Sequence, residues 1–154
     1  MDVEPGHFYL GGLIDDAGTR TEALTYEAAE LTTHGVIVGM TGSGKTGLAI
    51  DLLEEALLSG VPALIIDPKG DMTNLFLNFP DLAPSDFRPW IDESAARRQS
   101  VTADQLAMQV AGQWKEGLAS WDVDQARMRR LADAVALTVY TPGSTSGTAL
   151  NVLG

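Results

Sequence analysis

Residues 39–46 have the residue types and the spacing of a loop that binds phosphate groups. The segment reads Gly-Met-Thr-Gly-Ser-Gly-Lys-Thr and matches the pattern GxxxxGK[ST] at every fixed position. Its three glycines allow positive φ and remove Cβ atoms, so that consecutive backbone N–H groups can turn inward around an anion. A glycine-rich turn with only a structural role has no need of Lys45 followed by Thr46. The pattern therefore predicts binding of a nucleotide through its phosphates.

Each side chain of this loop has an expected role in holding ATP and Mg²⁺. We expect the Lys45 ammonium to lie against the β- and γ-phosphate oxygens, where it is the predicted catalytic lysine, and the Thr46 hydroxyl to ligate Mg²⁺. The start of the following helix adds free N–H groups and a positive dipole end. The predicted nucleotide-binding residues are Gly39, Thr41, Gly42, Ser43, Gly44, Lys45, Thr46 and Gly47.

A strand and a helix are expected to position the loop. Residues 36–38 are a β-branched run of the kind found in strands buried on both faces of a parallel sheet, and residues 46–58 have a helical apolar pattern. Residues 63–66 form a second buried-strand run. A right-handed strand–helix–strand crossover would bring the strand ends at Gly39 and Asp67 to one edge of the sheet.

Asp67 opens the run Asp-Pro-Lys-Gly-Asp at residues 67–71, and two roles are open for it. As a Walker B carboxylate it would act on the metal and be catalytic, because a hydrophobic strand ending in Asp fits that pattern. As the acceptor of an Asx turn it would only end the strand, with Lys69 in solvent. No other apolar run ends in an acidic pair, and the sequence identifies no base that would activate water.

The rest of the chain predicts a lead-in, a helical insert and a third strand. Residues 1–34 are expected to hold a β-hairpin, and residues 35–154 the nucleotide-binding core with a helical insert at about 92–135. A capping box at Thr102 opens one helix of the insert. Residues 137–141 have the pattern of a strand, and the tail after them has no predicted element. The predicted fold class is α/β, in three layers around a mostly parallel sheet.

Arginines and tryptophans outside the loop have ordinary structural interpretations. A solvated helix face is the expected place for Arg97, Arg98, Arg127, Arg129 and Arg130, with an arginine finger as the alternative. Trp114 and Trp121 lie at helical spacing beside leucines, which favours the core over a base-stacking platform.

Three segments resemble the HerA/FtsK superfamily of bacterial P-loop ATPases: residues 34–46, residues 66–71 and residues 140–144. The resemblance implies a P-loop NTPase and an ATP-driven motor, commonly a hexameric ring that pumps or unwinds DNA. Gly42, Gly44, Lys45 and Thr46 match the family's contacts to ATP and Mg²⁺. Relatives carry a later Walker B strand, a polar sensor and a trans-acting arginine. The chain therefore looks like the amino-terminal, truncated part of a longer ATPase, and hydrolysis is expected to need that longer protein.

The composition of the chain excludes several kinds of binding surface and site. The 154 residues include 10 Lys and Arg against 21 Asp and Glu, for a net charge of −11, so contact with DNA would have to be local. The absence of cysteine excludes a disulfide framework, cysteine-ligated zinc and thiol nucleophiles. No apolar run is long enough to span a membrane and no signal peptide is recognisable, which favours the cytoplasm.

Two further functions are compatible with the same loop. A nucleotide-sensing or assembly module would bind ATP without hydrolysing it. Such a module needs no water-activating base, and the sequence identifies none. A small-molecule kinase would need an acceptor pocket and an arginine-bearing lid, and neither is evident in the sequence.

Overall fold

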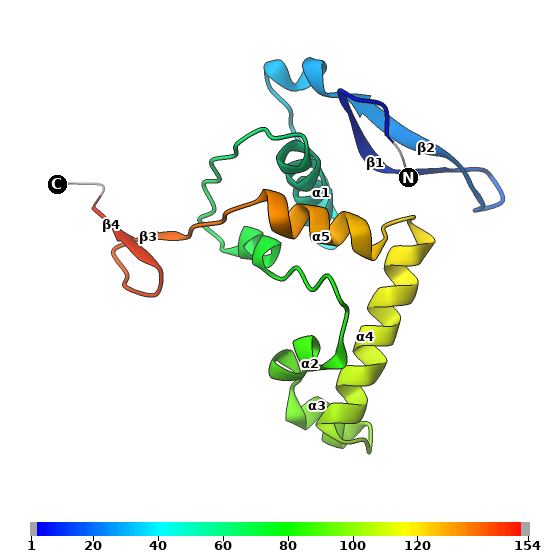
Figure 1. The fold of residues 1–154 in the computed structure, drawn as a ribbon, viewed down its shortest axis with the longest axis vertical. Coiled ribbons are helices and arrows are strands. Elements are labelled where there is room, and N and C mark those ends of the chain that lie inside the picture. Colours follow the sequence, from blue (N-terminus) through cyan, green and yellow to red (C-terminus); the bar gives the residue numbers. More distant parts are fainter. Residues whose placement is uncertain (1–2, 152–154) are drawn as a thin grey trace.

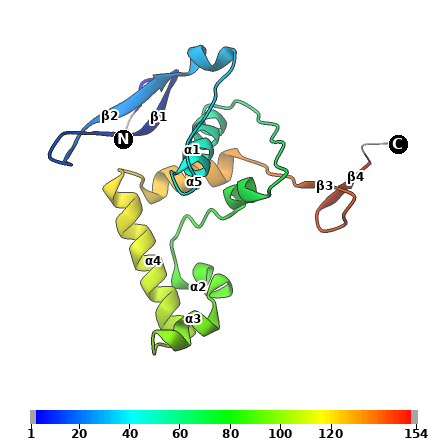
Figure 2. The same ribbon diagram turned by 180° about the vertical axis from the view of Figure 1, so that it is seen from behind.

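The computed structural model describes residues 3–151. Helix α1 (Lys45–Leu58) lies at the centre, with the hairpin of strands β1 and β2 on one side and helix α5 (Gln125–Ala134) packed across it (Figures 1 and 2). A separate group of helices lies below this centre in Figure 1, and strands β3 and β4 lie to the left, away from the hairpin. Within residues 3–151, no helix is both long and apolar enough to cross a membrane.

The amino-terminal hairpin joins β1 (His7–Ile14) to β2 (Arg20–Glu27) in antiparallel register. Asp15 builds the turn, because its carboxylate accepts the backbone N–H groups of Ala17 at 2.9 Å and Thr19 at 2.8 Å. A short 3-10 helix, η1 (Ala28–Thr32), follows the hairpin. The Tyr9 face of β1 packs against α1, so that the hairpin rests on the helix that follows the phosphate-binding motif.

The helical group has its own small core. Its elements are α2 (Pro84–Phe87), η3 (Arg88–Trp90), α3 (Glu93–Arg98) and α4 (Ala103–Ser120). The predicted capping box at the start of α4 is confirmed: Thr102 accepts the Gln105 N–H at 3.1 Å, and Gln105 accepts the Thr102 N–H at 2.8 Å. The core residues are Leu82, Phe87 and Ala111, with Phe79, Val110, Leu118 and Met128 packed against them.

Two details of this region differ from expectation. Prolines at residues 80, 84 and 89 favour an extended, turn-rich segment between residues 78 and 92, but short helices form there. Pro84 and Pro89 lie in the first turns of α2 and η3, where a missing N–H costs nothing. Trp114 approaches Phe87 with ring centroids 6.4 Å apart, yet it remains largely exposed rather than in the core.

Helix α1 agrees with the predicted helix at residues 46–58, and η2 (Asp71–Phe76) contacts it.

The predicted parallel sheet does not form among the described residues. Neither residues 36–38 nor residues 63–66 are strands. Within residues 3–151, the only parallel pair is β3 (Tyr140–Pro142) with β4 (Thr148–Leu150), and β4 lies in the tail, where no element was predicted. A β-branched run favours a strand through its side chains, but a strand exists only where a second segment completes its hydrogen-bond ladder. No described segment pairs with either run. The three-layer arrangement around a mostly parallel sheet is therefore not observed.

Candidate nucleotide-binding site

Helix α1 begins directly after the glycine-rich loop, and no side chain in the described part of the protein caps its start. The residue before the helix, Gly44, has φ of 87° in the left-handed region, and it offers no side chain to accept a hydrogen bond. The first turn contains no acidic residue. Leu48 donates its N–H to the Gly44 carbonyl at 3.0 Å, and within residues 3–151 the N–H groups of Lys45, Thr46 and Gly47 have no such acceptor. These free donors and the positive end of the helix dipole favour an anion.

The glycines of the loop are required by its shape. Gly42 has φ of 81°, in the same left-handed region as Gly44. A Cβ atom on Gly39 would lie 2.4 Å from the Ser43 Oγ, which is too close for any real contact. The Ser43 N–H donates to the Met40 carbonyl at 3.2 Å and closes the turn. Each glycine position of the motif thus carries either a positive φ or a close approach.

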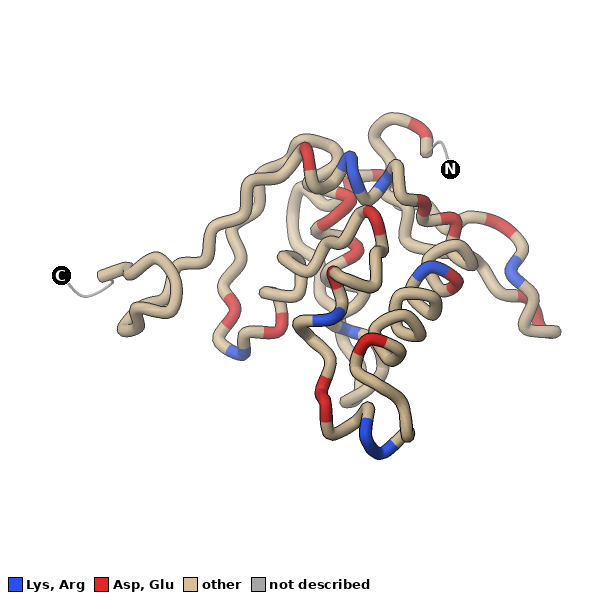
Figure 3. Tube along the Cα trace, turned by 60° about the horizontal axis from the view of Figure 1, so that its bottom comes forward, with Lys and Arg blue, Asp and Glu red and all other residues tan. Residues whose placement is uncertain are grey.

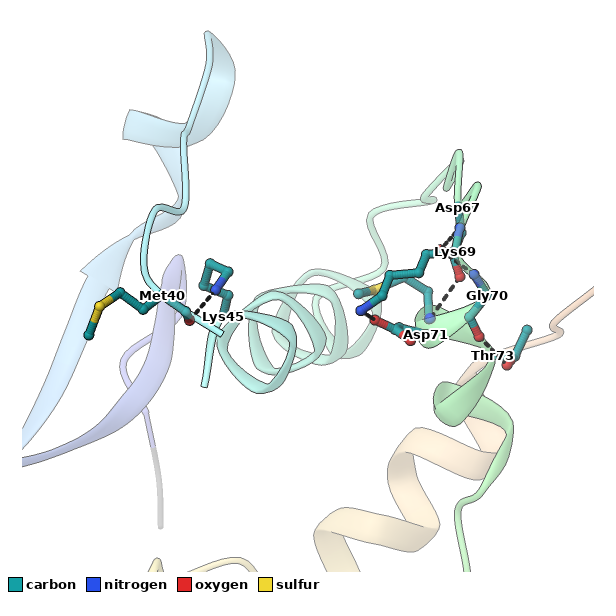
Figure 4. A network of polar contacts seen from close by, with 8 residues as sticks. Met40, Lys45, Asp67, Lys69, Gly70, Asp71 and Thr73 are labelled. Carbon is teal, nitrogen blue, oxygen red and sulfur yellow. Dashed lines mark hydrogen bonds and ion pairs between the residues drawn. The ribbon is translucent and has the colours of Figure 1, made fainter. Parts of the chain in front are cut away.

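Lys45 bends back over the loop that precedes it. Its Nζ donates to the Met40 carbonyl oxygen at 2.5 Å (Figure 4). No carboxylate within residues 3–151 pairs with this ammonium. The loop therefore presents a positive charge that has only a neutral carbonyl as its partner, and an anion would bind it more strongly than that carbonyl does.

Thr46 has the chemistry to be a magnesium ligand. It is half-buried in the first turn of α1, and its hydroxyl makes no hydrogen bond within the described part of the chain. Mg²⁺ binds oxygen ligands and commonly takes only one or two from the protein, completing its shell with water and phosphate oxygens. Residues 3–151 hold no cluster of three acidic, histidine or cysteine side chains that would form a metal cage. The residues present fit a metal brought in with phosphates.

Asp67 has the geometry of the Asx-turn alternative. Its carboxylate accepts the backbone N–H groups of Met72 and Gly70 at 2.8 Å each and of Lys69 at 3.2 Å. These hydrogen bonds, that from Met72 foremost, hold the pKa of Asp67 below its usual value. The Lys69 ammonium pairs with Asp71 at 2.6 Å, and Thr73 donates to the Gly70 carbonyl at 2.7 Å. The run at residues 67–71 is thus a hydrogen-bonded turn that leads into η2.

The structure does not bring Asp67 into contact with Lys45. Figure 4 shows the Lys45–Met40 pair on one side of α1 and the turn at residues 67–71 on the other. Within the described residues, no hydrogen bond or ion pair joins the two groups. The expected meeting of Gly39 and Asp67 at one sheet edge depends on strands that do not form here.

Removing the Asp67 carboxylate distinguishes its two roles. We expect Asp67→Ala to speed amide exchange at Gly70 and Met72, because both N–H groups lose their acceptor. The same variant should change the affinity for ATP and Mg²⁺ by less than about twofold, because separate sites act additively. Exchange measured by NMR and affinity measured by calorimetry check the two outcomes. An affinity loss beyond about tenfold would instead mark Asp67 as a metal-facing carboxylate.

The turn should also depend on pH in a defined direction. The folded pKa of Asp67 is lowered, so its stabilising effect is present above the usual carboxyl pKa and is lost as the pH falls through the lowered value. The amide chemical shifts of Gly70 and Met72 should therefore titrate below the usual range for Asp. A titration midpoint at or above the usual value would contradict the hydrogen-bonding geometry.

A buried ion pair between α1 and α5 is the feature that the sequence did not predict. Glu55 is only 4% exposed; its carboxylate accepts the Tyr9 N–H at 2.7 Å and pairs with Arg127 of α5. Arg127 was expected on a solvated helix face, and this expectation is wrong because the guanidinium is drawn to the buried carboxylate. Burial lowers the pKa of Arg127, while Asp51 and Glu54 act in the opposite direction. The pair joins the hairpin, α1 and α5 into one unit.

The position of Glu55 carried a signal in the sequence. The residue lies on α1 three positions after Leu52 and four before Ser59, within the face that packs on the hairpin. Acidic residues are almost never fully buried unless they are paired, so a Glu on a packing face indicates a cationic partner elsewhere. Its two neighbours Asp51 and Glu54 are half-buried, and burial raises the pKa of each.

Residues 8–135 match the family model described as "Helicase HerA, central domain". The chain belongs to this family. The match spans β1 through α5 and includes the glycine-rich loop, the turn at residues 67–71 and the helical group. Family membership implies the P-loop NTPase fold and an ATPase-type nucleotide-binding module. No curated protein and no solved structure matches the chain.

Proposed function

We propose that this HerA-family chain binds ATP together with Mg²⁺ at residues 39–46. The observation that carries the proposal is the start of α1, where three backbone N–H groups and the Lys45 ammonium converge on the loop without an acidic partner in the described chain. Membership of an ATPase-type family supports the same assignment. The chemistry of the site is that of a polyanion held by backbone donors and one point charge.

Each residue of the loop has a defined part in this proposal. The N–H groups of Lys45, Thr46 and Gly47 surround the phosphates, because the positive φ at Gly44 turns the start of α1 toward the loop. Lys45 exchanges the Met40 carbonyl for phosphate oxygens and so gains a charge-assisted hydrogen bond. Thr46 gives one oxygen ligand to Mg²⁺, and Gly39 keeps the base of the loop open for Ser43 and Lys45. Thr41 and Gly47 complete the contact surface.

The wider role that we propose is that of the nucleotide-binding part of a HerA/FtsK-like helicase or DNA translocase, working in the cytoplasm as a homo-oligomer. The family description names a helicase, which supports this role. DNA would contact only local loops, because the chain has a net charge of −11 and its Lys and Arg stand singly or in short groups, such as residues 97–98 and 127–130, among Asp and Glu (Figure 3).

Nucleotide binding without hydrolysis is a second candidate, and one observation favours it. The Asp67 carboxylate is taken up by backbone N–H groups, and no other carboxylate bonds to the loop within residues 3–151. The chain alone would then order its loop around ATP and turn over no substrate. Release of phosphate from ATP, compared with buffer alone, separates the candidates: steady turnover by these 154 residues excludes the second one.

The magnesium dependence of binding tests the proposed site. In wild type, we expect ATP to bind about tenfold more tightly with Mg²⁺ than with EDTA, because the Thr46 oxygen and the phosphates share the metal. Thr46→Val keeps the shape of the side chain and removes the hydroxyl, so the two affinities should become similar. Calorimetric titrations with and without the metal measure both ratios. Equal ratios in wild type and Thr46→Val would remove Thr46 from the site, and no binding by wild type would end the proposal.

A further inference from the structure

The side chain of Arg20 reaches from the start of β2 to the turn between α4 and α5. Its guanidinium donates to the Ser120 carbonyl at 3.0 Å and pairs with the Asp122 carboxylate at 2.8 Å. It also lies over the Trp121 ring, 5.9 Å from the ring centre, where a cation and an aromatic face attract each other. One side chain of the hairpin thus holds three successive residues, 120–122, which we call the corner.

Tyr9 of β1 makes a second link to the corner. Its hydroxyl accepts a hydrogen bond from Arg20 at 2.9 Å and donates one to the Trp121 carbonyl at 3.1 Å. Its backbone N–H donates to Glu55, so the hairpin connects the corner to α1. Figures 1 and 2 show the hairpin and the α4–α5 turn side by side. Within residues 3–151, no other hydrogen bond or ion pair joins the hairpin to residues 79–122.

Two glycines of β1 leave room for this arrangement. A Cβ atom on Gly12 would collide with the Arg20 Nε and lie only 2.6 Å from the Arg20 Cδ. Gly11 has φ of 128°, and a Cβ atom there would lie 3.9 Å from the Trp121 ring. Glycine inside a strand weakens the strand and marks a place where another group approaches closely. A side chain at residue 12 would therefore push Arg20 away from the corner.

The backbone of the corner has a conformation that the contact with Arg20 supports. Asp122 has φ of 57°, in the left-handed region that few residues other than glycine adopt, although Asp adopts it more readily than most. The N–H groups of Trp121 and Asp122 donate to carbonyls in the last turn of α4, at 3.0 and 3.2 Å. The ion pair with Arg20 fixes the residue that has the unusual φ. Loss of Arg20 would let the corner relax.

This contact can open without unfolding the structure on either side of it. The side chain of Asp122 is 52% exposed, so water can replace Arg20 as its partner at little cost. The helical group has its own core around Phe87, and none of the described residues in that core belongs to the hairpin. A contact between partly exposed polar groups, with few buried apolar side chains, opens at a lower free energy than the whole fold.

We propose that Arg20 and the corner form a releasable clasp that latches the helical group to the hairpin. In its closed form, the hairpin and the end of α4 move together. In its open form, the corner loosens and the helical group changes its orientation relative to the hairpin, while both remain folded. The clasp lies outside the proposed nucleotide contacts, and its opening does not require ATP.

Amide exchange measured by NMR tests whether Arg20 holds the corner. We expect Arg20→Ala to speed exchange at Trp121 and Asp122 at least about tenfold, because the hydrogen bonds of a charged group are lost. Leu106, at the far end of α4, should be unaffected. The matched control is Arg97→Ala, which removes the same charge and an exposed ion pair in α3. It should leave the corner amides unchanged.

Gly12→Ala tests the clasp without removing Arg20. The φ of Gly12 is not in the left-handed region, so alanine fits the backbone, but its Cβ blocks the path of Arg20. This variant should speed the corner amides as Arg20→Ala does. The double variant should exchange no faster than Arg20→Ala alone, because the shortened side chain no longer meets the new Cβ. Unchanged corner exchange in Arg20→Ala, equal acceleration in Arg97→Ala, or multiplied effects in the double variant would overturn the proposal.

The distance between two spin labels measures the release directly, because the chain has no cysteine of its own. Labels at Glu22→Cys in β2 and Met108→Cys in α4 stand on exposed positions on either side of the clasp. The distance distribution should become at least about twice as wide in Arg20→Ala and in Gly12→Ala, with an unchanged far-ultraviolet circular dichroism spectrum. An equal width with and without Arg20, or a loss of helical signal together with the widening, would contradict a clasp that opens between two folded parts.

Discussion

Replacing Lys45 with Ala is expected to weaken binding of ATP with Mg²⁺ by about 100-fold, since a hydrogen bond to a charged group contributes about 1.5–3 kcal/mol. The Lys45 ammonium has only the Met40 carbonyl as a partner in the described chain, so it loses little when it turns to phosphate oxygens. The backbone donors at the start of α1 remain in the variant and should preserve weak binding. Isothermal titration calorimetry at low ionic strength measures the ratio.

The control for this prediction is Lys69→Ala, which changes the net charge by the same amount. Lys69 is an exposed lysine paired with Asp71 in the turn at residues 67–71. Its loss should alter the ATP affinity by less than about twofold, because screening weakens the effect of exposed distant charges. Equal affinities in wild type and Lys45→Ala would refute the assigned role of Lys45. If Lys45→Ala and Lys69→Ala lost ATP affinity equally, the loss would come from the net charge and not from a contact made by Lys45.

Replacing Glu55 with Ala is expected to destabilise the fold by about 3–5 kcal/mol, the usual cost of breaking a buried ion pair from one side. The change leaves the Arg127 guanidinium, only 21% exposed, without its carboxylate. It also leaves the Tyr9 N–H of β1 without an acceptor. Both losses act on the contacts that hold the hairpin and α5 to α1. Urea denaturation followed by far-ultraviolet circular dichroism measures the free energy of unfolding.

Glu54→Ala is the matched control for Glu55, one position earlier on the same helix. Glu54 is half-buried and makes no ion pair or hydrogen bond within the described chain, and burial raises its pKa. Its removal should change the free energy of unfolding by less than about 1 kcal/mol, because a surface-like substitution breaks no specific contact. Equal free energies of unfolding for Glu55→Ala and Glu54→Ala would contradict the claim that the ion pair of Glu55 with Arg127 stabilises the fold.

Local sequence patterns predicted local structure well in this chain. The capping box at Thr102 and helix α1 are found where their patterns placed them. Gly42 and Gly44 have the positive φ that the phosphate-loop pattern demands, because that requirement is set by the backbone of the loop itself. The family resemblance seen in residues 34–46 and 66–71 agrees with the HerA family match.

Features that depend on distant partners were not predictable in this way. The runs at residues 36–38 and 63–66 have strand-forming side chains, but a ladder needs a neighbour that no local pattern specifies. Arg127 was placed on a solvated face because its helix pattern contains no sign of Glu55, which lies on another helix. The sequence left two roles open for Asp67. The hydrogen bonds that its carboxylate accepts from the N–H groups of Lys69, Gly70 and Met72 are evident only in the folded chain.

The central claim is that the loop at residues 39–46 holds phosphate groups through its backbone. The most direct test is a titration of isotope-labelled chain with ATP and Mg²⁺, followed through individual backbone amides by NMR. The largest shifts should fall on the amides of Lys45, Thr46 and Gly47, which are the free N–H groups at the start of α1 within the described chain. If these amides stay unmoved at saturating ATP, or move less than those of the turn at residues 67–71, the claim is wrong.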